Sequence, residues 1–290
     1  MLNNLKEGLK NFIRRYFSII WIRDKFSAAL QINQRHLFLY YQQCVAEKKQ
    51  ILLKDTGYKV FSQNEEDGLL VFIFAVIGMQ RKTFVDIGGN DGVNSNCANF
   101  AINFGWHGLF IDSDKTAVSR GVRFYKRYPD PWAFKPRFAA VNVTRENINT
   151  IVSDEGFAGV IDLLSIDIDG NDYWIWEALT VVEPNVVIVE CKVEYGFNNI
   201  VVPYDPTYSH LKKDPLYNGA SPFAFNQLAS RKGYRLVGAN NYGHNLIFVK
   251  RGLADDYLPE VSLATLLTHP SAIEGFKDFD KVKHLPFLQG

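Results

Sequence analysis

The chain has no apolar run of the roughly 18 residues that a membrane-spanning helix requires. Cysteine is scarce, with 3 among 290 residues, and Cys44, Cys97 and Cys191 show no metal-binding spacing. Their odd number and the lack of a secretory signal favour reduced thiols in a cytoplasmic protein. A charge excess is also lacking, because the formal net charge of +1 provides no general attraction to nucleic acid.

Several signalling and binding motifs are missing as well. The apolar segment FSIIWI, residues 17–22, is too short for the core of a signal peptide and is followed directly by charged residues. No Gly-x-Gly-x-x-Gly fingerprint occurs, which disfavours a dinucleotide-dependent oxidoreductase. No Asn-Pro-Pro-Tyr-like motif occurs, which disfavours an enzyme that flips nucleic-acid bases. We therefore expect no nucleic-acid partner.

Residues 1–55 are expected to form an N-terminal helical extension. The first 25 residues hold six Lys or Arg and two Asp or Glu. The extension fits a helix docked on the rest of the chain or on a second copy in a homo-oligomer. It also fits a helix lying on an anionic membrane surface. The apolar positions at helical spacing are Leu5, Leu9, Phe12, Ile13, Phe17 and Ile20.

Strand-like and helix-like segments alternate between residues 83 and 250, which predicts a mostly parallel sheet with helices on both faces. Only NNYG, residues 240–243, joins the last two strands, so the last strand should run antiparallel. The fold class is therefore α/β, a Rossmann-like doubly wound sheet with a reversed last strand. Expected strands are 83–87, 107–111, 137–141, 161–166, 185–190, 234–239 and 245–250. Expected helices lie near 93–104, 114–127, 145–153, 172–180 and 221–232.

Residues 56–252 are expected to form this α/β domain. A stretch rich in proline and tyrosine, residues 191–220, interrupts the alternation after a central strand. A long connection at that place is expected to be a lid over the ligand-binding edge of the sheet. Residues 253–290 are expected to form a C-terminal tail that wraps the domain.

The most informative segment is FVDIGGNDGVNSN, residues 84–96, in which an apolar strand ends at an acid and a glycine-rich turn. Gly88 and Gly92 allow the backbone to approach a ligand closely and to adopt positive φ angles. The spacing Asp86-x-Gly88-x-x-x-Gly92 favours a ligand made of a nucleoside and an amino acid. Asp112 follows twenty residues after Gly92, at the end of a second apolar run, and can accept hydrogen bonds from both hydroxyls of a ribose.

Polar residues end, or directly follow, the expected parallel strands: Asp86, Asp112, Asn142, Asp167 and Glu190. Ligands of such sheets bind beyond the carboxyl ends of the strands, so these side chains should converge on one edge. His244 begins the antiparallel strand and is expected at the same edge, beside Glu190 and Asp167. It is a candidate metal ligand or base there, or a structural histidine.

The segment DIDGND, residues 167–172, carries paired acids. In an extended chain Asp167 and Asp169 would face the same side, an arrangement that supplies a metal ligand and a base. Oxygen ligands of this kind suit Mg²⁺ or Mn²⁺. Asp172 is expected to cap the helix that follows.

Taken together, these segments resemble those of class I S-adenosylmethionine-dependent methyltransferases over roughly residues 60–250. The long SIDIDGNDYW box is similar to the FkbM-type and macrocin-type sugar O-methyltransferases of natural-product and surface-glycan pathways. The resemblance implies a methyltransferase domain over residues 56–252 that transfers a methyl group to the hydroxyl of a sugar or glycan acceptor. The matching segments are FSQNEEDG (61–68), VDIGGNDG (85–92), LFIDSD (109–114), LLSIDIDGNDYW (163–174) and VVIVE (186–190).

The resemblance also assigns contacts with S-adenosylmethionine. Asp86 and Gly88 are expected to hold its methionine end through backbone contacts, and Asp112 to hold its ribose. Asn142, or Val143, is expected to face the adenine ring, although Asn142 could equally serve only as a turn residue. The full expected set is Gln63, Asp86, Gly88, Asn90, Gly92, Asp112, Asn142 and Asp167.

For catalysis, we expect Asp167, Glu190 and His244 to bind Mg²⁺ or Mn²⁺, leaving Asp169 to take the proton of the acceptor hydroxyl. The alternative is metal-free catalysis with His244 or Asp169 as the base. Two other functions remain open: a methyltransferase acting on a small molecule other than a sugar, and a non-catalytic Rossmann-like binding protein.

Overall fold

The computed structural model describes residues 27–128, 134–208 and 214–290. They contain a 7-stranded sheet in the order β3-β2-β1-β4-β5-β7-β6, in which β7 runs antiparallel to both of its neighbours. This confirms the predicted doubly wound α/β fold with a reversed last strand. The strands are β1 (Thr83–Ile87), β2 (His107–Asp112), β3 (Arg137–Ala140), β4 (Gly159–Ile166), β5 (Val182–Glu190), β6 (Tyr234–Ala239) and β7 (Asn245–Lys250).

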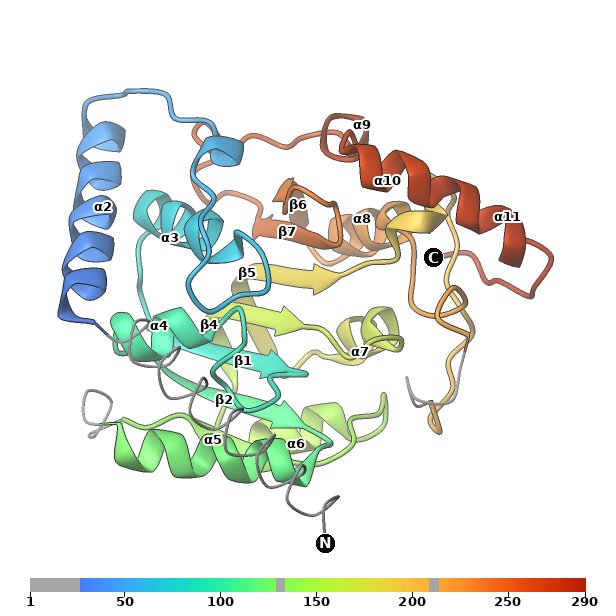
Figure 1. The fold of residues 1–290 in the computed structure, drawn as a ribbon, viewed down its shortest axis with the longest axis horizontal. Helices are drawn as coiled ribbons and strands as arrows, with labels where there is room; N and C mark the ends of the chain where they lie inside the picture. Colours follow the sequence, from blue (N-terminus) through green and yellow to red (C-terminus); the bar gives the residue numbers. More distant parts are fainter. Residues whose placement is uncertain (1–26, 129–133, 209–213) are drawn as a thin grey trace, which may run out of the picture.

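Helices cover both faces of this sheet (Figure 1). One face carries α3 (Glu66–Ile77), α4 (Ala98–Asn103) and α5 (Lys115–Arg127), with α2 (Ala28–Ala46) packed outside α3. The other face carries α6 (Ile148–Asp154), α7 (Asp172–Ala178) and α8 (Pro222–Arg231). Three short helices follow in the C-terminal segment: α9 (Leu263–Leu266), α10 (Pro270–Gly275) and α11 (Phe279–Val282). Single 3₁₀ turns are η1 (Leu53–Asp55), η2 (Val193–Tyr195) and η3 (Phe276–Asp278).

The central strands are apolar on both sides, and their alternate residues enter two separate cores. In β5, Val187 and Val189 pack with α6–α8, whereas Val186 and Ile188 pack with α3 and α4. Successive side chains of a strand point to opposite faces, so a central strand covered on both faces reads as a continuous apolar run. This is why the strand segments could be recognised from sequence.

The helix predicted near 93–104 begins later, at Ala98. Side chains occupy the backbone N–H groups that an earlier helical turn would have used. Asp91 accepts hydrogen bonds from the N–H groups of Val93 and Asn94, at 3.1 and 3.4 Å, and Ser95 Oγ accepts one from Cys97. Such local side-chain bonds compete with a helix, and they hold residues 91–97 as a turn.

The described part of the N-terminal extension packs on the rest of the chain. Gln34 of α2 accepts hydrogen bonds from Tyr58 Oη at 3.1 Å and from Asn99 Nδ2 at 2.6 Å. The ring of Tyr41 meets the ring of Phe72 edge-on, with 5.0 Å between centroids. The apolar stripe expected between Leu5 and Ile20 lies outside the described residues.

The C-terminal segment is tied to the sheet and to the connection between β5 and α8. The buried guanidinium of Arg235 in β6 donates to the carbonyls of Leu253 and Leu258, at 2.8 and 2.9 Å. Leu288 forms an isolated antiparallel bridge with Val201. Among the residues described, no helix combines the length and the apolar character needed to span a membrane.

Candidate functional site

The glycine-rich loop after β1 lies between the ends of β2 and β4. The N–H groups of Gly88 and Gly89 donate to the carbonyl of Ile111, at 2.8 and 3.1 Å. Gly88 has a φ of 91°, and a Cβ at this position would overlap the carbonyl oxygen of Asp167. Only glycine therefore fits at position 88, and the loop brings its backbone close to the start of the 167–172 segment.

Asp86 supports this loop from inside the protein. Its side chain is 2% exposed and accepts a hydrogen bond from the hydroxyl of Ser95. Burial raises the pKa of Asp86 to about 6, while the bond from Ser95 acts in the opposite direction. Gly92 is also buried, and its carbonyl accepts a hydrogen bond from Tyr125 Oη at 2.7 Å.

Asp112 at the end of β2 holds the neighbouring loop segments. One carboxylate oxygen accepts a hydrogen bond from the N–H of Asn90 at 2.9 Å, and the other accepts from the N–H of Asp114 at 2.7 Å. Each carboxylate oxygen can accept more than one hydrogen bond, so both remain able to receive a ligand hydroxyl.

A cavity of about 840 Å³ lies over these strand ends; we call it the cofactor cavity. It brings together six of the predicted cofactor residues: Gln63, Gly88, Asn90, Asp112, Asn142 and Asp167. Asp86 and Gly92 do not line it. Their places are below the loop, because the side chain of Asp86 turns toward Ser95 and Gly92 packs against Phe110.

Further residues line the cofactor cavity that were not among the predicted cofactor contacts. Ser113, Asp114, Ile168 and Asn171 come from the strand-end loops. Pro206, Thr207 and Tyr208 come from the segment between β5 and α8, for which the sequence predicts a lid. The amide of Asn171 donates to the carbonyl of Asp205 at 2.8 Å, which connects that segment to the α7 loop.

Three carboxylates gather at the ends of β4 and β5. Asp167, Asp169 and Glu190 each place one oxygen within 4.8 Å of those of the others. Burial raises the pKa of both Asp167 and Glu190, and the charge of Asp167 raises the pKa of Glu190 further. Acids this close cannot all ionise without a counter-charge, so the cluster holds a shared proton or a cation.

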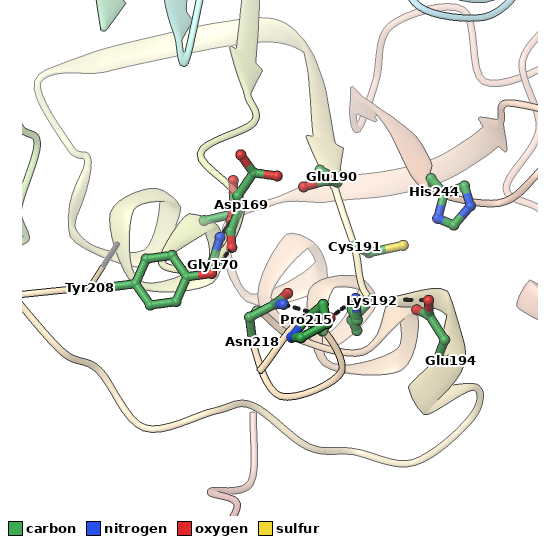
Figure 2. Close-up of a pocket in the computed structure, with 12 residues that line it drawn as sticks. Asp169, Gly170, Glu190, Cys191, Lys192, Glu194, Tyr208, Pro215, Asn218 and His244 are labelled. Carbon is green, nitrogen blue, oxygen red and sulfur yellow. Dashed lines mark hydrogen bonds and ion pairs between the residues drawn. The ribbon is translucent and has the colours of Figure 1, made fainter. Parts of the chain in front are cut away.

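His244 is not a member of this cluster, which corrects its expected place beside Asp167 and Glu190. The pairing of β5 with β7 sets Asn245, not His244, opposite Glu190. Neighbouring residues of a strand point to opposite faces, so His244 lies alongside Cys191, whose N–H donates to the His244 carbonyl at 2.7 Å. In Figure 2, Asp169 and His244 lie on opposite sides of Glu190. The third member of the cluster is Asp169 and not His244.

Asp172 has a different role from the predicted helix cap. The residue before α7 is Asn171, and no side-chain hydrogen bond caps this helix. The buried carboxylate of Asp172 instead accepts hydrogen bonds from the N–H groups of Ile168 and Gly170, at 2.7 and 2.8 Å. Asp172 therefore shapes the loop that carries Asp167 and Asp169.

A second cavity, of about 320 Å³, adjoins the acid cluster at Asp169 and Glu190 (Figure 2); we call it the acceptor cavity. It shares Asp169, Glu190 and Tyr208 with the cofactor cavity. Lys192 and His244 contribute nitrogen groups, and burial lowers the pKa of His244 so that its imidazole is neutral at pH 7. The remaining lining residues are Gly170, Asp172, Cys191, Glu194, Pro215, Asn218 and Gly219.

Glu66 connects two segments near the cofactor cavity. This fully buried carboxylate accepts hydrogen bonds from the side-chain amides of Asn240 and Asn245, both at 2.8 Å. It also accepts one from the N–H of Asn64 at 2.8 Å. The segment that carries Gln63 is thereby joined to the turn between β6 and β7.

Comparison with known proteins gives low similarities. No protein-family model and no curated protein matches the chain. Solved structures that resemble it include a putative caffeoyl-CoA O-methyltransferase from Staphylococcus aureus, with 14% identity over 76% of this chain and 99% of that one, and a TM-score of 0.43. Another is the magnesium protoporphyrin IX methyltransferase from Synechocystis PCC 6803 with bound SAM, with 11% identity over 83% and 96% of the two chains, and a TM-score of 0.39. The O-methyltransferase from Bacillus cereus in complex with SAH has 15% identity over 58% and 74%, and a TM-score of 0.38. Because these identities and TM-scores are low, any assignment of function depends on the chain's own residues and geometry.

Proposed function

We propose that the protein is an S-adenosylmethionine-dependent O-methyltransferase that acts on a hydroxyl of a sugar or glycan. One observation carries the proposal: the cluster of Asp167, Asp169 and Glu190 lies where the cofactor cavity and the acceptor cavity meet. A methyl donor in the first cavity and a hydroxyl in the second would meet at these carboxylates. Positioning of both reactants and removal of the hydroxyl proton are the two requirements of such a transfer.

The cofactor cavity suits a nucleoside joined to an amino acid. Gly88 and Asn90 present backbone groups for the amino-acid end, and Asp112 has free lone pairs for the ribose hydroxyls. Asn142 and Val143 form the wall for the adenine ring, and Gln63 closes the cavity from the segment before α3. When bound, S-adenosylmethionine supplies a methyl group on a positively charged sulfur. The carboxylates of the cluster favour that charge beside them.

Asp169 is the proposed base. It is the exposed member of the cluster and lines both cavities, so it can reach an acceptor hydroxyl. Asp169 accepts the hydroxyl proton as the acceptor oxygen attacks the methyl group. His244 lines the acceptor cavity from the far side and serves the acceptor there as a neutral hydrogen-bonding group.

The same cluster fits a divalent cation. Three oxygen donors within 4.8 Å of one another match the ligands that Mg²⁺ and Mn²⁺ prefer, and a cation would offset the repulsion among them. Asp167, Asp169 and Glu190 would hold the ion. Bound there, the ion would lower the pKa of an acceptor hydroxyl and orient it. Asp169 would then share its carboxylate between the ion and the proton.

The acceptor cavity supports a polar substrate. Its wall offers charged and amide groups from Lys192, Glu194 and Asn218, together with the ring of Tyr208. Sugars are recognised by such a combination of hydrogen-bonding groups and an aromatic face. The resemblance of the SIDIDGNDYW segment to sugar O-methyltransferases supports the same class of acceptor.

The experiment that tests the proposal is in two steps. Calorimetry should first show binding of S-adenosylmethionine and of its demethylated product by the full chain. Radiolabelled S-adenosylmethionine should then transfer label to members of a panel of monosaccharides, nucleotide sugars and oligosaccharides, with small phenols as the non-sugar comparison. Absence of cofactor binding would refute the methyltransferase proposal, and label on phenols alone would refute the sugar acceptor.

A further inference from the structure

Asp169 has an unusual backbone conformation. Its φ of 60° lies in the left-handed region, which non-glycine residues seldom occupy. Asp172 holds the residues on both sides, because its carboxylate accepts from the N–H of Ile168 at 2.7 Å and from that of Gly170 at 2.8 Å. A conformation of this kind persists where the surroundings hold it in place.

Tyr208 supplies the second restraint, from a distant part of the chain. Its hydroxyl donates a hydrogen bond to the backbone carbonyl of Asp169, 39 residues away in sequence. Its ring lies directly on Gly170, where a Cβ would overlap ring atoms. Figure 2 shows this ring beside Asp169 and Gly170 at the edge of the acceptor cavity. The segment between β5 and α8 thus restrains the loop at the residue that carries the proposed base.

Tyr208 also lines both cavities, as Asp169 and Glu190 do. The segment has a further attachment two residues after Asp169, where Asn171 Nδ2 donates to the carbonyl of Asp205 at 2.8 Å. Residues 169, 170 and 171 are consequently each in contact with residues 205–208. The position of this segment and the direction of the Asp169 carboxylate are linked through three consecutive residues.

We propose that Tyr208 is a positioning residue: through the Asp169 carbonyl and the surface of Gly170 it aims the Asp169 carboxylate at Asp167 and Glu190. The inference rests on the proposed function, because it gives a lid residue control over the proposed base and ion ligand.

Substitution of Tyr208→Phe tests this directly, because it keeps the ring on Gly170 and removes only the hydroxyl. The matched control is Tyr204→Phe in the same connection between β5 and α8. Its hydroxyl accepts from the N–H of Arg145 at 3.1 Å and donates to the carboxylate of Glu146 at 2.9 Å, and Tyr204 lines neither cavity. Mn²⁺ binding is followed by electron paramagnetic resonance with the demethylated cofactor present. We expect Tyr208→Phe to weaken Mn²⁺ about tenfold, as loss of a residue supporting a ligand does, with cofactor affinity unchanged. Wild-type Mn²⁺ affinity in Tyr208→Phe would overturn the proposal.

Hydrogen exchange of residues 167–171 keeps the test decisive if the wild-type protein binds no Mn²⁺ or no cofactor. Absence of cofactor binding would count against the proposed function, and absence of Mn²⁺ binding against the proposed ion. The positioning role still predicts faster exchange of the Ile168 and Gly170 amides in Tyr208→Phe than in the wild type or in Tyr204→Phe. Equal exchange in all three proteins would refute the role of Tyr208 whatever the function of the site.

Discussion

Gly88 and Asp167 are packed backbone to backbone, so closely that a Cβ on residue 88 would overlap the Asp167 carbonyl oxygen. The N–H of Asp167 in turn donates to the carbonyl of Ile87 at 2.9 Å. The backbone of the glycine-rich loop and the backbone at the start of the acid cluster are therefore in direct contact, and neither can move without the other.

The first prediction is that Gly88→Ala abolishes cofactor binding. The left-handed backbone alone costs about 1–2 kcal/mol for a residue with a side chain, and the overlap with Asp167 forces the loop away from the cavity. The control is Gly78→Ala, which has a similar φ of 86° and no atom within 4 Å of its new Cβ. Calorimetry with the demethylated cofactor and urea unfolding separate the two effects. Equal loss of cofactor affinity in both variants would contradict the argument from packing.

Asp112→Ala should weaken cofactor binding about ten- to a hundredfold. The variant loses charge-assisted hydrogen bonds to the ribose, which contribute about 1.5–3 kcal/mol. The control Ser27→Ala removes a hydroxyl that accepts from the N–H of Leu30 at 3.2 Å and caps α2, at a position that lines neither cavity. That control should lower stability by about 1 kcal/mol and leave affinity nearly unchanged. Cofactor affinity equal to wild type in folded Asp112→Ala would exclude Asp112 as the ribose ligand.

Metal dependence gives the third prediction. After exhaustive EDTA treatment we expect methyl transfer to stop and to return with Mg²⁺ or Mn²⁺, and Asp167→Asn to stay inactive while still binding cofactor. Glu194→Gln is the control, because Glu194 lines the acceptor cavity outside the cluster. It should bind Mn²⁺ as the wild type does. Full activity in the chelated enzyme would eliminate the ion and leave Asp169 as a base without a metal.

The buried Asp86 predicts a pH effect on stability. Burial raises its pKa from 3.8 to about 6, so the folded protein holds this proton more tightly than the unfolded chain. The stability from this proton is fully present below pH 3.8 and is lost as the pH rises through 6. Asp86→Asn cannot ionise, so its unfolding free energy should gain about 2 kcal/mol on the wild type between pH 4 and pH 7. Urea unfolding at both pH values measures this gain, and a pH-independent difference between the two proteins would refute it.

Deletion of residues 1–26 should leave the site intact. The boundary falls before Ser27, which caps α2, because α2 itself packs on α3 through Tyr41 and accepts a hydrogen bond from Tyr58 through Gln34. We expect unchanged cofactor affinity. We also expect a change either in the oligomeric state in solution or in binding to anionic vesicles. A truncated protein with the same oligomeric state and the same vesicle binding as the full chain would exclude both a second copy of the chain and a membrane surface as partners of this segment.

The strands and the strand-end residues could be predicted because they follow local rules. Apolar runs ending at Asp86, Asp112 and Glu190 mark strands whose carboxyl ends meet at one edge. The error at His244 concerns side-chain direction, because β7 begins at Asn245 as predicted. Side-chain direction alternates along a strand, so the pairing of Asn245 with Glu190 turns the preceding residue, His244, away from Glu190. The hydrogen bonds between Asn240 and Asn245 set this pairing, and no sequence pattern reports them.

Residues that act through long-range contacts could not be found in this way. Tyr208 reaches Asp169 only because the segment after β5 folds back over the α7 loop, and no periodicity marks it. Asp172 occupies the position of a helix cap in sequence, yet its carboxylate binds the preceding loop because Ile168 and Gly170 offer free N–H groups there. In both cases the competing partner lies in tertiary structure.

The carboxylate of Glu66 has a consequence for synthesis of the chain. Its partners Asn240 and Asn245 are 174 and 179 residues further along, so they leave the ribosome long after α3 does. Until then, a nascent chain carries a carboxylate that stays in water instead of in the interior, because a buried charge without partners is costly. We expect the segment of Gln63 to settle only when the last hairpin is made. A chain stopped before residue 240 would then contain every described strand except the antiparallel β7 and still be unable to enclose a ligand.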